Sequence, residues 1–169
     1  MSRKPADAAA QANAATVARF YGALARRDAE RMIACYAPDA EFSDPMFPRL
    51  DRDGVAAMWR MLCERGHDLV VTASNIRARD DEATAAWLAV YTYGATGRRV
   101  ENRIVARFSF RDGRIVRHVD RFDLMRWARQ ALGPAGTILA LPGFRTVLRR
   151  RAAAMLARYR GRDARTATA

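Results

Sequence analysis

Hydrophobic positions in the first 66 residues follow the spacing of helices. A first helix is predicted to end near Arg27, because its apolar residues recur at intervals of three and four. Asp28 and Asp53 are suitable N-caps for two more helices, and the second of these ends at Gly66. The apolar faces comprise Val17, Phe20, Tyr21 and Leu24 in the first helix, Met32, Ile33 and Tyr36 in the second, and Val55, Met58, Trp59 and Leu62 in the third.

From residue 69 onward the pattern changes to the alternation typical of strands. Strands are predicted over residues 69–79, 84–93, 100–110 and 113–122, and a final helix over 123–132. Asp112-Gly113 between the last two strands is a strong hairpin signal. A short earlier strand passes through Phe42, between the second and third helices. Helices followed by an antiparallel meander indicate an α+β fold.

The length of 169 residues suits one folded domain, which we predict over residues 14–132. Residues 1–13 and 161–169 are predicted to be disordered, and residues 133–160 to form an apolar loop and a basic amphipathic helix. That helix is expected to cover an open end of the domain or a dimer seam. The alternative is contact with a membrane surface of anionic lipid.

The net charge of +12 is concentrated at the C-terminal end. Residues 133–169 hold eight arginines and one acidic residue, whereas residues 1–132 are only mildly basic. No basic segment is combined with base-stacking aromatic residues in a nucleic-acid motif, so no specific nucleic-acid partner is expected.

The two cysteines, Cys35 and Cys63, have no CxxC spacing, which predicts a reducing compartment without a disulfide framework. The first 15 residues lack the apolar run of a signal peptide, and no stretch approaches about 20 apolar residues. We therefore expect a cytoplasmic protein. No compact metal-ligand motif is present, and neither a metal nor a cofactor is predicted.

Asp44 is the first candidate for chemistry. It follows Phe42 in the alternation of the short strand and precedes Pro45, where a strand must end or lie at an edge. A carboxylate held beside apolar neighbours has a raised pKa and can act as a base for proton transfer. The alternative, which the local sequence favours, is that Asp44 caps or turns the chain before Pro45.

The last strand supplies two further candidates, His118 and Asp120. Alternation places both between Val116 and Phe122 on one face, and these apolar flanks indicate that the face points inward. Together with Asp44 they predict a small-molecule pocket in which these three residues are catalytic. The alternative for His118 is a core imidazole bonded to a backbone carbonyl or to Asp120. The residues predicted to contact a small hydrophobic substrate are Asn102, Tyr91, Trp87, Trp59 and Phe20.

Two segments carry a family resemblance. The run from Arg19 to Leu24, Asp28, and the run from Tyr36 to Pro45 resemble the nuclear transport factor 2-like superfamily, which includes ketosteroid isomerases, SnoaL-like polyketide cyclases and limonene epoxide hydrolases. The residues 112–115 and 118–123 fit the closing hairpin of SnoaL-like domains. The resemblance covers roughly residues 14–132 and implies a cone of curved antiparallel sheet wrapped by N-terminal helices. It also implies a homodimer formed through the outer face of the sheet.

The functional residues of the three enzyme groups match this sequence to different extents. Asp44 matches the general base of the isomerases, but Phe20 and Ala106 stand where the oxyanion donors would be. Tyr21 is one residue further along and would face elsewhere on the helix. Asp120 matches one of the two Asp residues of the epoxide hydrolases, whereas Ile104 and Ala106 replace their Arg and second Asp. The polyketide cyclases, with an acid/base Asp on the last strand, are matched best.

Two functions follow from the sequence. The first is a cofactor-free acid/base enzyme of isomerase, cyclase or hydrolase type that acts on a small hydrophobic, carbonyl-bearing substrate. The second is a non-catalytic ligand-binding or dimerisation module in which the same polar groups are structural.

Overall fold

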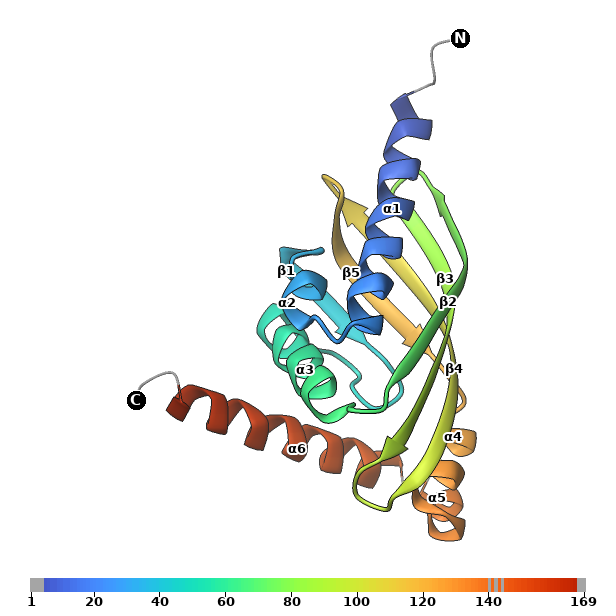
Figure 1. Cartoon of the computed structure of the whole chain (residues 1–169), viewed down its shortest axis with the longest axis vertical. Helices are drawn as coiled ribbons and strands as arrows, with labels where there is room; N and C mark the ends of the chain where they lie inside the picture. The colour runs from blue at the N-terminus through green and yellow to red at the C-terminus, as the bar shows by residue number, and fades with distance from the viewer. Residues whose placement is uncertain (1–4, 140, 142, 144, 167–169) are drawn as a thin grey trace.

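The structure, a computed structural model, describes residues 5–139, 141, 143 and 145–166, and it has the predicted α+β architecture (Figure 1). Three helices and one strand come first, followed by four long strands and three C-terminal helices. Their bounds are α1 Pro5–Ala25, α2 Ala29–Ile33, β1 Tyr36–Ser43, α3 Arg52–Arg65, β2 Val70–Arg79, β3 Glu82–Tyr93, β4 Arg98–Arg111, β5 Arg114–Arg121, α4 Leu124–Leu132, α5 Pro134–Leu139 and α6 Arg145–Thr166.

The five strands form one curved sheet in the order β1-β5-β4-β3-β2. The meander from β2 to β5 is antiparallel, and β1 adds to β5 in parallel. The β4–β5 hairpin turns at Asp112 and Gly113, whose φ angles of 52° and 72° are those of the predicted tight turn. A register shift between Ser74 and Arg77 interrupts the β2–β3 pairing, and Asn75 within it has a φ of 52°. Such bulges bend a strand, which accounts for the curvature.

Helix α1 lies across the concave side of the sheet and packs on β2 and β3 (Figure 1). It begins at Pro5, so the disorder predicted for residues 1–13 is wrong for residues 5–13. The alanine-rich segment has high helix propensity, and tertiary contacts hold it. Asn13 and Thr16 are buried, and their side chains bond to the backbone carbonyls of Asp80 and Gly113 at 3.0 and 3.3 Å. Residues 1–4 lie outside the described part of the chain.

The C-terminal segment is more helical than predicted. The apolar loop expected after residue 132 contains the short helix α5, and α6 continues through Thr166 instead of ending at residue 160. One stripe of α6 is buried against the domain, which agrees with a covering role: Leu148, Ala152, Leu156 and Tyr159. The disorder predicted for residues 167–169 concerns residues outside the described part of the chain. Among the described helices, none has both the length and the apolar character to cross a membrane.

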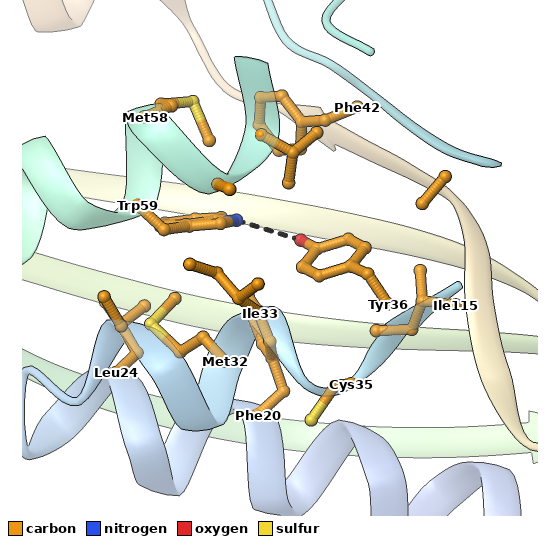
Figure 2. Close-up of a cluster of buried hydrophobic side chains, with 14 of the residues drawn as sticks. Phe20, Leu24, Met32, Ile33, Cys35, Tyr36, Phe42, Met58, Trp59 and Ile115 are labelled. Carbon is orange, nitrogen blue, oxygen red and sulfur yellow. Dashed lines mark hydrogen bonds between the residues drawn. The ribbon is translucent and has the colours of Figure 1, made fainter. Parts of the chain in front are cut away.

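The core fills the space between α1, α2, α3 and the concave face of the sheet, and aromatic residues dominate its centre (Figure 2). Tyr36, which was predicted to lie in the second helix, is the first residue of β1 and is only 1% exposed. Phe42 and Phe20 approach the centre from β1 and α1, and Trp59 approaches it from α3. The Trp59 indole N–H donates to the Tyr36 hydroxyl at 3.0 Å, so the core contains a polar pair at its middle.

Gly136 allows α5 to pack closely on α4. A Cβ atom at this position would lie 2.0 Å from the carbonyl oxygen of Ala128, a distance that backbone atoms cannot accommodate without moving. We therefore expect Gly136→Ala to lower the free energy of unfolding by about 1–3 kcal/mol in a urea denaturation experiment. Gly94→Ala is the matched control, because a Cβ there meets nothing within 4 Å. Equal stability of the two variants would contradict this packing.

Candidate functional site

Asp44 directly follows β1 and closes a tight turn. Its Oδ1 accepts the backbone N–H groups of Met46 and Phe47 at 2.7 and 2.5 Å, and its own N–H donates to the Phe47 carbonyl at 2.8 Å. Beyond the turn, Leu50 pairs with Phe42 in an isolated antiparallel bridge. The turn role proposed for Asp44 is therefore real. It fixes the orientation of the carboxyl group through one oxygen.

The environment of Asp44 also suits proton transfer. Burial raises the pKa of the half-buried Asp44 carboxyl from its ordinary 3.8 to about 7, against the opposing effect of the two backbone N–H donors. The negative charge of Asp120 raises this pKa further, and the Arg149 guanidinium lowers it. A carboxyl group with a pKa near 7 exchanges its proton readily at neutral pH.

His118 and Asp120 lie side by side on β5, as the alternation predicted. His118 is fully buried and Asp120 is 4% exposed, and His118 Nε2 lies 3.0 Å from Asp120 Oδ1. The other ring nitrogen, Nδ1, lies 2.7 Å from the Tyr36 hydroxyl. Trp87 on β3 directs its indole N–H to the same Asp120 oxygen at 3.4 Å.

The donors in this network fix its direction. The Trp59 indole can only donate, so the Tyr36 oxygen accepts from it, and the Tyr36 O–H is free to donate to His118 Nδ1. His118 Nε2 then carries the ring proton and donates it to Asp120. This assignment follows from satisfying every group in turn. In this arrangement the His118 ring, held by Tyr36, orients the Asp120 side chain.

The cavity predicted around His118 is filled by side chains. Phe20, Phe42, Trp59 and Phe108 surround the imidazole, with the Phe108 ring centroid 4.2 Å away. Dispersion and burial favour this packing because each ring is large and apolar. His118 is therefore a core imidazole bonded to Asp120, which was the alternative interpretation of this residue from the sequence. Phe20 and Trp59, predicted to contact a substrate, pack against it.

Tyr21 is buried, as its place on the apolar face of the first helix predicted, but its position beside Asp120 was not expected. Its side chain is only 3% exposed, and its ring contacts those of Trp87 and Phe108. Its hydroxyl has no hydrogen-bond partner among the described residues. Burial raises the pKa of Tyr21, and the negative charge of Asp120 raises it further. Tyr21 is thus an unpaired donor beside a carboxylate.

The other predicted contact residues lie on the inner face of the sheet. Trp87 and Tyr91 on β3 are half-buried, as is Asn102, which pairs with Ala89 across β3 and β4. The Tyr91 hydroxyl accepts the Trp127 indole N–H at 2.8 Å. Burial raises the pKa of Tyr91, and the charge of Asp44 contributes to that rise. The side chains of Tyr91 and Tyr21 are thus each coupled to one of the two carboxylates.

Two cavities stand out on the described surface, and neither is lined by Asp44, Asn102 or Asp120. One, of about 420 Å³, lies beside the paired strands β1 and β5 and has His118 among its lining residues, although the His118 side chain itself is fully buried. The other, of about 350 Å³, lies between the loop after Asp44 and α6. Among the described residues, no three His, Cys, Asp or Glu side chains are grouped as metal ligands.

A protein-family model for the SnoaL-like domain matches residues 17–118, which include Asp44 and His118. The chain belongs to the SnoaL-like family. No curated protein matches it. The match runs from the second half of α1 to His118 in β5, and Asp120 lies two residues beyond it.

Solved structures support the same fold for this SnoaL-like chain. A putative polyketide cyclase from Streptomyces antibioticus, IdmH, is 25% identical, with a TM-score of 0.60, over 70% of this chain and 96% of that one. An NTF2-like protein of unknown function from Burkholderia pseudomallei is 23% identical, with a TM-score of 0.63, over 70% and 96%. An epoxide hydrolase from M. tuberculosis, described as LEH-like, is 20% identical, with a TM-score of 0.60, over 77% and 95%.

Proposed function

We propose that the protein is an acid/base enzyme that moves a proton on a small hydrophobic, carbonyl-bearing substrate, without requiring a cofactor for that step. Asp44 is the base, Tyr21 is the oxyanion donor, and Asp120 is a second carboxylate that His118 and Tyr36 hold in place. The observation that carries the proposal is that burial raises the pKa of both Asp44 and Tyr21, and that the nearby charge of Asp120 adds to each rise.

The proposed reaction begins at a C–H bond next to the substrate carbonyl. The Asp44 oxygen that the turn leaves unused takes the proton, and the C–H electron pair moves into the carbonyl group to form an enolate. The Tyr21 O–H, which has no partner among the described residues, donates to the enolate oxygen. Return of a proton from Asp44 to the same carbon completes an exchange, and its delivery to a conjugated carbon completes an isomerisation; either regenerates the carboxylate.

Asp44 is assigned as the base because its carboxyl group is more accessible to a substrate than that of Asp120. Asp120 already accepts two N–H groups at Oδ1 and is almost fully buried. Asp44 is half-buried and has one oxygen outside its turn. The similarity to a putative polyketide cyclase supports the reaction class.

The test is exchange of the acidic C–H protons of 2-tetralone for deuterium, followed by proton NMR near neutral pH. We expect the protein to accelerate exchange above the buffer rate, and Tyr21→Phe to slow it by about 100-fold, because one oxyanion donor is lost. Tyr93→Phe is the matched control, since Tyr93 also lies on the aromatic inner side and packs against Trp127. Exchange at the buffer rate would favour the non-catalytic binding module, and equal accelerated rates for both variants would show that Tyr21 is not the oxyanion donor.

A further inference from the structure

A second site lies outside the Asp44–Asp120 region, in the cavity of about 350 Å³ between residues 46–50 and α6. Its floor is apolar and includes Met46, Phe47 and Leu156. Its rim is basic and includes Arg149, Arg150 and Arg160 from α6. The volume falls in the range of small-molecule sites.

The helical spacing of α6 builds this rim. Residues 146, 149, 150, 153, 156, 157 and 160 line the cavity, and their spacing of 3, 4, 7, 10, 11 and 14 from residue 146 places them on one face of the helix. Ala153 and Ala157 are small, which leaves depth between the basic residues at either end. The cavity therefore has an apolar centre with positive charge at both ends of one helix face.

The charge around the cavity is one-sided. No Asp or Glu lines it, and the sequence from residue 124 to residue 162 contains nine arginines and no acidic residue. Arg149 donates its Nε to the Pro45 carbonyl at 3.1 Å, which positions its guanidinium at the cavity wall. Arg150 and Arg160 are exposed. Arg49, also at the rim, is paired with Glu41.

We propose that this cavity binds a soluble amphipathic anion, an apolar body that carries one carboxylate or phosphate group. The apolar part would cover Phe47 and Leu156, and the anionic group would be held by Arg150 or Arg160, because a guanidinium pairs with such groups through two parallel N–H donors. The inference goes beyond the proposed function and does not depend on it. The Met46 N–H that bonds to Asp44 connects the two sites.

The test is isothermal titration calorimetry of the full chain with decanoate below its micelle concentration. We expect one decanoate to bind, decyltrimethylammonium not to bind, and the double variant Arg150→Gln/Arg160→Gln to bind decanoate at least tenfold more weakly. The matched control is Arg151→Gln/Arg158→Gln, which removes the same charge from exposed positions of α6 that do not line the cavity. The control should stay within twofold of the wild type.

A second variant tests the cavity without changing its charge. Ala153 is exposed and lines the cavity, so Ala153→Leu should fill the space and weaken decanoate binding. Unchanged affinity for Ala153→Leu, equal weakening by the two double variants, or no binding by the wild type would overturn the proposal. So would binding only to vesicles of phosphatidylglycerol, which would identify α6 as a lipid-binding surface.

Discussion

Asp44→Asn is expected to slow the exchange of 2-tetralone protons by about 100- to 10,000-fold. The asparagine side-chain oxygen can still accept the N–H groups of Met46 and Phe47, so the turn after β1 is retained. The substitution removes only the ability to take a proton. The loss should therefore appear in the exchange rate measured by NMR, with the circular dichroism spectrum unchanged.

Two further variants make this result specific. Asp123→Asn also removes one carboxylate, but it retains a side-chain oxygen that can accept the Arg126 N–H at the start of α4, so its exchange rate should match that of the wild type. Asp120→Asn distinguishes the two inner carboxylates. If Asp120→Asn abolished exchange while Asp44→Asn had little effect, Asp120 would be the base and our assignment would be wrong.

Asp44→Asn, which is expected to slow proton exchange, should increase the stability of the fold. The Asp44 carboxyl has a pKa of about 7 in the folded protein and an ordinary value of 3.8, so folding disfavours its ionised form. Between these values the folded protein binds more protons than the unfolded chain, and stability falls as the pH rises towards 7. Asp44→Asn should thus be more stable than the wild type at pH 8, by up to about 4 kcal/mol, with no such gain near pH 4.

His118→Ala is expected to lower the free energy of unfolding by about 3–5 kcal/mol, a large part of the stability of a typical domain. The substitution leaves the Asp120 carboxylate buried without its main donor and removes the acceptor of the Tyr36 hydroxyl. It also opens a void among the rings of Phe20, Phe42 and Phe108. Chemical denaturation monitored by fluorescence would measure the change.

The chain contains its own control for this experiment. His67, the only other histidine, follows α3 and is exposed, so His67→Ala should change stability by less than about 0.5 kcal/mol. A similar small effect for His118→Ala would show that the Tyr36–His118–Asp120 network does not stabilise the fold. It would also remove the physical reason for a fixed Asp120 side chain.

Local patterns were sufficient for most of the fold. The alternation in β3, β4 and β5 and the Asp112-Gly113 turn depend on neighbouring residues, and these elements were confirmed. The start of α1 could not be predicted in this way, because Asn13 and Thr16 are held by hairpin carbonyls far along the chain. Alternation counted from His118 would put Ile115 on the outer face, but Ile115 is fully buried because a register shift in the β4–β5 pairing reverses the alternation there.

The candidate site was predicted in part for the same reason. Asp44, His118 and Asp120 lie at positions where strand alternation is informative. The positions of Tyr36 and Tyr21 depend on how α1, α3 and β1 enclose the concave face of the sheet. Tyr21 is one residue away from the position expected for an oxyanion donor, but it still lies at the site because both sides of α1 are covered. The Tyr-Ala-Pro run at residues 36–38 could have indicated an earlier start for β1, since Pro38 is unsuited to a helix interior.

Carbon-13 NMR of the side-chain carboxyl groups tests the central claim most directly. The signal of Asp44, assigned by its loss in Asp44→Asn, should titrate with a midpoint near pH 7. Asp68, an exposed carboxylate whose bonds to Thr92 lower its pKa, provides an internal contrast and should titrate well below Asp44. A midpoint for Asp44 near its ordinary pKa of 3.8 would contradict its role as the catalytic base. A carboxyl group with that pKa would be a poor base at neutral pH, and Asp44 would then be a turn residue only.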